Sequence, residues 1–137
     1  MCDEASNALG FEAKAWGPLA WQYIHIIAMN YPRNPTAKDV RLYKKFLFNF
    51  ADTLPCSECR TNFRQILKDR LRPSVHLKNC KTLSRFMFDL HNAVNKKLGK
   101  RVVPRAKYAT VLEYFMTMAD PGSSTTIILE KKNAIKK

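Results

Sequence analysis

Hydrophobic residues recur along most of the chain at steps of three and four, the spacing that places them on one face of an α-helix. The pattern predicts five helices, over about residues 16–31, 36–50, 56–71, 83–98 and 108–118. The fourth segment has a particularly strong stripe, formed by Leu83, Phe86, Met87, Leu90, Val94 and Leu98. The alternating patterns typical of strands are nearly absent.

Turn and capping residues delimit these segments. Trp16-Gly17-Pro18 predicts the start of the first helix, because proline is favoured at the first helical position. Thr36 and Asp39 have the spacing of a capping box at the start of the second. Pro55 pushes the residue before it out of helical geometry and separates the second helix from the third. Gly99 follows the fourth helix at the position where glycine commonly ends one.

These elements predict an all-α fold, a four-helix up-and-down bundle with a short fifth helix across one end. We expect one domain over residues 13–119, a flexible N-terminal arm over residues 1–12 and a flexible basic tail over residues 120–137. In bundles of this kind a cofactor lies between facing helices.

Composition and charge narrow the range of partners. The chain has 137 residues, of which 46% are hydrophobic, and this is enough for one core. Lys and Arg number 24 against 11 Asp and Glu, which gives a net charge of +13. The basic residues are spread along the chain. We therefore interpret most of them as solvated helix surface and some as contacts to a phosphate-bearing cofactor, and we do not expect a nucleic-acid partner.

Targeting signals are not evident. No apolar run reaches the roughly 18 residues that a membrane span needs. The start Met1-Cys2-Asp3-Glu4 has no signal-peptide character, so we expect an untargeted chain without a membrane partner. Four cysteines are too few for a secreted disulfide scaffold and indicate chemistry instead.

A Cys-x-x-Cys pair, Cys56 and Cys59, stands at the start of the third helix. Two cysteines at this spacing can face each other on a first helical turn, where free N–H groups and the helix dipole stabilise a thiolate. The spacing suits a redox dithiol, half of a zinc site or a structural pair. Cys59 shares a face with Phe63, Ile66 and Leu67. We therefore predict that Cys59 points inward and that Cys56 lies nearer the rim.

Two polar residues of the fourth helix, His91 and Asn95, lie one turn apart on a largely apolar stripe. Buried polar groups need partners, so these two either satisfy each other and the nearby backbone or hold a polar ligand inside the bundle. Lys96 and Lys100 follow directly, which suits a ligand with a flat ring system and phosphates. His25 of the first helix is more typical of a satisfied core residue or a cap, unless a ligand is nearby.

Several blocks together resemble the Erv/ALR family of FAD-linked sulfhydryl oxidases. The resemblance spans about residues 14–115. In order, the blocks are Trp16-Gly17-Pro18-x-x-Trp21-x-x-x-His25, Tyr31-Pro32, Pro55-Cys56-x-x-Cys59, and His91-Asn92-x-Val94-Asn95-Lys96-Lys97-Leu98-Gly99-Lys100.

The resemblance implies a five-helix protein, usually a homodimer, that holds FAD in the mouth of a four-helix bundle. Such a protein forms disulfides in a thiol-containing client or relay protein and reduces molecular oxygen to hydrogen peroxide. Cys59 would be the flavin-proximal cysteine, and Cys56 would exchange with the client. The FAD contacts implied by position are Trp16, Gly17, Trp21, His25, Tyr31, His91, Asn92, Val94, Asn95, Lys97, Lys100, Lys107 and Tyr108.

The sequence departs from the cellular members of the family at two points. Cellular members generally carry a structural disulfide with a cysteine three residues before the His-Asn pair; here that position is Phe88, and no cysteine follows Cys80. The long N-terminal Cys-x-x-Cys arm is also missing. The chain is thus most similar to the thiol oxidases of large cytoplasmic DNA viruses, which implies the host cytoplasm and the virion as locations. A cellular member would instead lie in the mitochondrial intermembrane space.

Two other readings stay open at this point. Cys56, Cys59, His76 and Cys80 form a ligand set of the right type for one zinc ion on a basic module that interacts with nucleic acid. Against it, a continuous helix would separate the two halves of that set, and we predict no metal site. The third reading keeps the fold as a redox-inert scaffold. We assign no catalytic role to Cys2 or Cys80.

Overall fold

The computed structural model describes residues 12–119, and all the regular structure in that range is helical. The helices are α2 (Ala13–Met29), α3 (Ala37–Asp52), α4 (Ser57–Arg70), α5 (Pro73–His76), α6 (Cys80–Lys97), the 3₁₀ turn η1 (Arg105–Lys107) and α7 (Tyr108–Ala119). Residues 1–11 of the expected arm, which include Cys2, and the expected tail at residues 120–137 lie outside the described residues.

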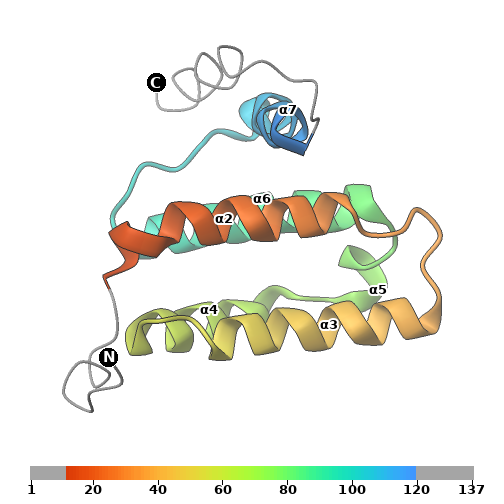
Figure 1. Cartoon of the computed structure of the whole chain (residues 1–137), viewed down its shortest axis with the longest axis horizontal. Helices are drawn as coiled ribbons and strands as arrows, with labels where there is room; N and C mark the ends of the chain where they lie inside the picture. Colours follow the sequence, from red (N-terminus) through yellow and green to blue (C-terminus); the bar gives the residue numbers. More distant parts are fainter. Residues whose placement is uncertain (1–11, 120–137) are drawn as a thin grey trace.

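The four long helices form two layers (Figure 1). Helices α2 and α6 lie side by side in one layer, and α3 and α4 in the other, with successive long helices running in opposite directions. Helix α7 packs on the outer side of the first layer, mainly against α2. The prediction of an all-α, up-and-down four-helix fold is therefore confirmed. None of the described helices is both long enough and apolar enough to span a membrane.

The core lies between the two layers, as the hydrophobic stripes predict. Its fully buried side chains come from α2, α3, α4, α6 and the α5–α6 connection, and the largest are Ile24, Leu47, Leu67, Leu77, Leu83, Met87 and Leu90. A smaller cluster joins α7 to the bundle through Phe88, Val111, Tyr114 and Phe115. The stripes of the fourth and fifth predicted helices thus pack against different partners.

Capping groups fix the ends of two helices. Thr36 and Asp39 form the predicted capping box of α3. At the end of α6, Gly99 has a φ of 68°, the left-handed conformation that glycine adopts readily. The Lys100 N–H donates to the Asn95 carbonyl oxygen at 2.8 Å and the Gly99 N–H to that of Lys96 at 3.2 Å, which is a Schellman motif.

Two predicted boundaries are wrong. Helix α2 begins at Ala13, about one turn before the expected start, and Pro18 lies inside it. Its missing N–H leaves the carbonyl of Lys14 without a helical partner, but Lys14 is exposed at the helix start, where water can bond to that oxygen. The segment between the third and fourth predicted helices, residues 72–82, contains the single turn α5, and α6 already begins at Cys80.

Candidate functional site

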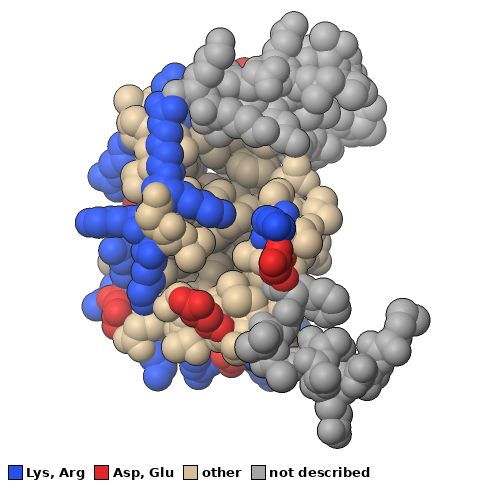
Figure 2. Space-filling model, turned by 90° about the vertical axis from the view of Figure 1, so that its left-hand side faces the viewer, with Lys and Arg blue, Asp and Glu red and all other residues tan. Residues whose placement is uncertain are grey.

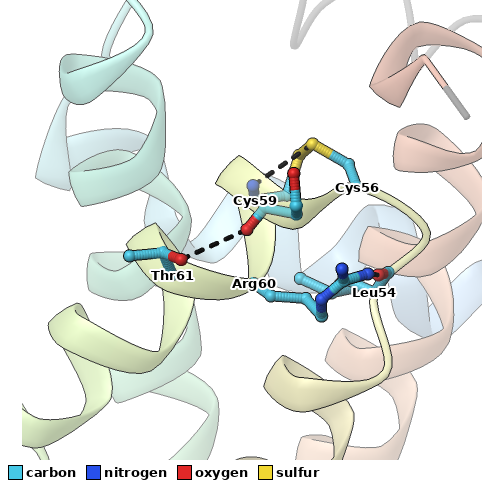
Figure 3. The surroundings of a disulfide bond; sticks show 6 residues. Leu54, Cys56, Cys59, Arg60 and Thr61 are labelled. Carbon is cyan, nitrogen blue, oxygen red and sulfur yellow. Dashed lines mark hydrogen bonds between the residues drawn. A yellow bond between two sulfur atoms is a disulfide. The ribbon is translucent and has the colours of Figure 1, made fainter. Parts of the chain in front are cut away.

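The Cys-x-x-Cys pair is a disulfide at the N-terminus of α4 (Figure 3). Cys56 and Cys59 are bonded, with their Cα atoms 5.1 Å apart. Cys56 is the N-cap residue, and its Sγ accepts a hydrogen bond of 3.2 Å from the backbone N–H of Cys59. The turn before it is held by Arg60, whose Nη1 donates to the Leu54 carbonyl oxygen at 2.7 Å. The helix start therefore presents a preformed, partly exposed redox pair.

The two sulfur-bearing residues face different surroundings. Cys59 lines a cavity of about 630 Å³ at the end of the bundle, together with residues of α2, α3, α6 and α7. Cys56 does not line that cavity and is partly exposed. This agrees with the predicted inward orientation of Cys59 and the outer position of Cys56. A sulfur at position 59 thus connects the cavity with a sulfur that a second protein can reach.

Aromatic rings form much of the cavity wall. Trp21 stacks on His91 with ring centroids 3.7 Å apart and an interplanar angle of 8°. Phe63 of α4 packs against Trp21, with centroids 5.8 Å apart. Phe115 of α7 stacks on His25 at 4.5 Å. Such flat, apolar faces suit a planar ligand.

A pair of histidines links the cavity wall to the core, with His91 in the wall and His25 behind it. His25, only 5% exposed, places its Nε2 3.1 Å from Nδ1 of His91, so one ring donates and the other accepts. Burial, together with the nearby His91, lowers the pKa of His25 from 6.5 to about 3. Burial and the charge of Lys100 lower the pKa of His91 to about 4. Both rings are therefore neutral at pH 7 and form an uncharged link between α2 and α6.

Basic side chains border one edge of the cavity. Lys97 and Lys100 both line it, and the Schellman motif at the end of α6 fixes the backbone of Lys100. Figure 2 looks at this end of the molecule and shows a hollow with Lys and Arg side chains gathered along one side. Positive charge beside an apolar cavity is the arrangement that a ligand with a flat ring and phosphates requires.

The structure brings together most of the residues predicted to contact a ligand. Eight of them line the cavity: Trp16, Gly17, Trp21, His91, Val94, Asn95, Lys97 and Lys100. His25 lies one layer further in, where it contacts three residues that line the cavity, His91, Phe115 and Trp21.

The other four predicted contacts lie elsewhere and have other partners. Tyr31 is 2% exposed, and its hydroxyl donates to the Leu77 carbonyl oxygen at 3.0 Å, so it ties α2 to the α5–α6 connection. Asn92 faces away from the cavity. Its Nδ2 donates to the Val103 carbonyl oxygen at 2.8 Å, and its Oδ1 accepts from the Val103 N–H at 2.9 Å.

Lys107 ends the 3₁₀ turn η1 and Tyr108 begins α7, and neither lines the cavity. Lys107 is exposed. Tyr108 packs edge-on against Phe88, with ring centroids 5.4 Å apart, and its ring lies under the Arg85 guanidinium at 5.7 Å. Tyr108 therefore attaches the start of α7 to the bundle.

Several residues that line the cavity were not predicted to contact a ligand. Phe50, Phe63 and Phe115 lie within predicted helices, where a core position and a cavity position have the same periodicity. Asn62 follows Cys59 by three residues, and this helical spacing was the available signal for a polar group on the same face.

The zinc reading is not supported by the arrangement of its ligands. Cys56 and Cys59 are bonded to each other at one end of α4, whereas His76 lies beyond its other end, and 14 residues of helix span roughly 21 Å. His76 Nδ1 accepts a hydrogen bond from the Arg72 N–H at 2.9 Å. Within residues 12–119 no group of three or more His, Cys, Asp or Glu side chains is placed to hold a metal ion.

Comparisons with known proteins agree with this geometry. The model of the Erv1/Alr family matches residues 18–114. The chain is 30% identical over 102 residues to a protein of Acanthamoeba polyphaga mimivirus named a probable FAD-linked sulfhydryl oxidase, a match that covers 74% of this chain and 71% of that protein. It is also 30% identical over 99 residues to the FAD-linked sulfhydryl oxidase of an African swine fever virus isolate, covering 72% of this chain and 80% of the viral protein.

A solved structure shares the fold. The crystal structure of the FAD binding domain of Erv1 from Saccharomyces cerevisiae superposes with a TM-score of 0.64 at 28% sequence identity. The superposition covers 72% of this chain and 90% of that one. The match therefore extends over nearly all of a domain whose name records FAD binding.

Proposed function

Because the chain belongs to the Erv1/Alr family, we propose that it is an FAD-dependent sulfhydryl oxidase with Cys56 and Cys59 as its redox pair. It oxidises two thiols of a client to a disulfide and reduces O₂ to H₂O₂. One observation carries the proposal: the inner cysteine of a disulfide lines a cavity with aromatic walls and a basic edge. The names of the relatives and of the structural neighbour support the same activity.

The residues around the cavity fit FAD. A volume of about 630 Å³ lies within the range of roughly 300–1,000 Å³ typical of cofactor and ligand sites. Asn62 and Asn95 line the cavity, and their side-chain amides hydrogen-bond to none of the described residues, which leaves them available for the polar edge of a ring. Lys97 and Lys100 provide charge for the phosphates. When bound, FAD supplies two-electron transfer from thiol sulfur to oxygen.

The cysteines perform the thiol–disulfide exchange. A client thiolate attacks Sγ of Cys56, the Cys56–Cys59 bond breaks, and Cys59 leaves as a thiolate on the cavity side. A second client thiolate then attacks the client sulfur of the mixed disulfide and releases Cys56 as a thiolate. The N–H of Cys59 and the N-terminus of α4 stabilise that charge. Two electrons have now passed from the client to the enzyme dithiol.

The walls of the cavity set the conditions for this exchange. The His25–His91 pair is neutral at pH 7 because both pKa values lie well below 7, so it places no charge beside the cavity. Trp21 and Phe63 add apolar ring surface to the cavity that Cys59 also lines. Cys56 remains partly exposed, so the client need not enter the cavity.

The proposal includes a homodimer. Leu19 and Tyr23 are exposed on one face of α2, and Leu42 is exposed on α3. Both helices lie on the viewer's side of the two layers in Figure 1. Exposed apolar side chains of two helices on one side of the bundle fit an isologous interface with a second copy. Tyr23→Glu is expected to convert the dimer to a monomer in analytical ultracentrifugation, and a wild-type monomer would contradict the pairing.

For location, we propose the host cytoplasm and the virion, on the basis of the viral relatives. A mitochondrial relative from Saccharomyces cerevisiae, 34% identical over 84 residues, supports the alternative of the intermembrane space. Immunolocalisation of the protein in its own cell type distinguishes the two compartments.

The test of the activity combines a spectrum with turnover. We expect the purified protein to show flavin absorption bands and to consume oxygen when a small dithiol is added, with one H₂O₂ formed per dithiol oxidised. Cys59→Ser is expected to keep its flavin and to lose at least a hundredfold in thiol-dependent oxygen uptake. Cys80→Ser, which changes a partly buried cysteine outside the pair, serves as the control and keeps full activity. Oxygen uptake that survives in Cys59→Ser would contradict the assignment.

A further inference from the structure

The chain segment that follows α6 concentrates positive charge at the end of the bundle that holds the disulfide. Residues 96–107, called here the basic rim, contain six Lys and Arg and no Asp or Glu. Of these six, only Arg105 forms an ion pair with a described residue, at 3.2 Å from Asp89. The rim also exposes two apolar side chains, Leu98 at 50% and Val102 at 44%.

The backbone of the basic rim is fixed at several points. The Schellman motif holds its start through Lys100 and Asn95. Both side-chain groups of Asn92 bond to the backbone of Val103 and hold its middle. The Lys107 N–H donates to the Pro104 carbonyl oxygen at 2.8 Å. A surface whose backbone is already ordered loses little conformational entropy when a partner binds.

The basic rim lies beside the path that a client must take. Its residues Lys97, Leu98 and Lys100 line the same cavity as Glu58 and Cys59 of α4, so the rim and the disulfide border one opening. Figure 2 shows basic side chains along one side of that opening. A client that brings its sulfur to Cys56 therefore enters the positive electrostatic field of the rim. Among the described residues that line the cavity, Glu58 is the acidic one.

The chemistry of the rim favours an acidic polypeptide over a nucleic acid. Residues 96–107 contain no Phe, Tyr, Trp or His, so the rim has no ring on which bases can stack. Leu98 and Val102 are single aliphatic contacts of the kind that accompany charged side chains in protein interfaces. Complementary charge raises association rates and selects partners.

We propose that the basic rim selects clients that carry Asp or Glu beside the thiols to be oxidised. This inference rests on the proposed function. The carboxylates of the client meet Lys96 and Arg101, two exposed residues that do not line the cavity. The bonds made and broken are those of the exchange at Cys56, and the rim acts on the rate at which the client arrives.

The experiment compares three synthetic dithiol peptides that share one Cys-x-x-Cys core and differ only in acidic, neutral or basic flanks. For each, kcat/KM is measured by oxygen uptake in the FAD-loaded protein at several salt concentrations. The variant is Lys96→Gln/Arg101→Gln. The matched control is Lys78→Gln/Lys81→Gln, which removes two exposed charges near the other end of α6, roughly 22 Å away along a helix of 1.5 Å rise per residue.

We expect wild type and control to prefer the acidic peptide over the neutral one at low salt. The rim variant should lose roughly fivefold of that preference, because two exposed charge pairs are removed. The preference should vanish in 1 M salt, where the Debye length is about 3 Å. Comparing ratios between variants cancels the effect of the flanks on the intrinsic reactivity of the peptide thiols.

Three results would overturn the inference: equal rates for the three peptides in wild type, the same loss in the control, or a preference that persists at high salt. Weaker retention of a DNA or RNA duplex by the rim variant, with peptide preference unchanged, would assign the rim to nucleic acid instead. Turnover of a small neutral dithiol reports separately on the proposed function. If wild type fails to oxidise that dithiol, the enzyme assignment falls, whereas loss of the peptide preference alone removes only the rim.

Discussion

Acidification should destabilise this fold in a way that can be traced to two side chains. His25 and His91 are neutral and bonded to each other, and burial lowers their pKa values from 6.5 to about 3 and about 4. In the unfolded chain both titrate near 6.5. Between pH 6.5 and 4 the unfolded state therefore binds more protons than the folded state, so the free energy of unfolding falls as the pH falls.

The size of the effect follows from linkage. One pKa unit corresponds to 1.36 kcal/mol, and pH 5 lies 1.5 units below the unfolded value. Acidification to pH 5 therefore lowers the free energy of unfolding by about 2 kcal/mol for each histidine, or about 4 kcal/mol for the pair, out of a typical total of about 5–15 kcal/mol. Above pH 6.5 none of this stability is lost. Because the rings are in contact, the pair titrates as a unit and the sum is an upper bound.

Urea unfolding at half-unit steps from pH 5.0 to 7.5 measures the effect. His25→Gln should keep a hydrogen-bonding group and lose about half of the pH-dependent stability. His76→Gln is the matched control. Burial also lowers the pKa of His76, but its ring accepts a hydrogen bond from the Arg72 backbone and does not belong to the His25–His91 pair. Two results would refute the assignment to these histidines: a wild-type loss of less than about 1 kcal/mol between pH 7 and pH 5, or a pH dependence of the free energy of unfolding that is unchanged in His25→Gln.

Three further substitutions test how the site is held. Tyr31→Phe leaves the buried Leu77 carbonyl without its hydrogen-bond donor and should lower the free energy of unfolding in urea by about 1–2 kcal/mol. The flavin content per chain should stay unchanged, whereas a loss of flavin would indicate that Tyr31 contacts the cofactor. Asn92→Ala removes both hydrogen bonds to the Val103 backbone and should lower the free energy of unfolding by about 2–3 kcal/mol. An unchanged value would show that other contacts hold the segment between α6 and η1. Gly99→Ala meets no atom within 4 Å but must adopt a φ of 68°, so it should cost about 1 kcal/mol, and a gain in thermal stability would contradict the strain argument.

The parts of the fold that follow from local periodicity could be predicted. The stripe of α6 places Leu83, Met87 and Leu90 in the core, because a 3.6-residue period leaves one buried face. The inward position of Cys59 follows from its spacing of four to Phe63 on the same helix. Gly99 could be predicted as well, because a residue with positive φ at a helix end is commonly glycine.

The parts that depend on long-range packing could not be predicted from the chain alone. Asn92 and Asn95 lie three residues apart on α6, yet one holds the crossover at Val103 and the other lines the cavity. Which of the two side chains meets the backbone of Val103 depends on the path of residues 98–104, and helical periodicity does not specify that path. The predicted helix start at Pro18 was wrong for a similar reason. The preference of proline for a first helical turn is local, and it does not take into account that water can bond to the freed carbonyl when the helix start is exposed.

The division of labour that we propose for the two cysteines follows from the start of a single helix. Cys56 is the N-cap residue in extended conformation, and Cys59 is the third helical residue. A cap residue lies outside the helical cylinder, whereas the third residue already follows the helical period into the bundle. Leu54 and Arg60 fix the turn before the cap, so the relation between the two positions does not depend on the client. A disulfide placed across a helix start can therefore exchange with a protein on one side while its other sulfur stays at the cavity.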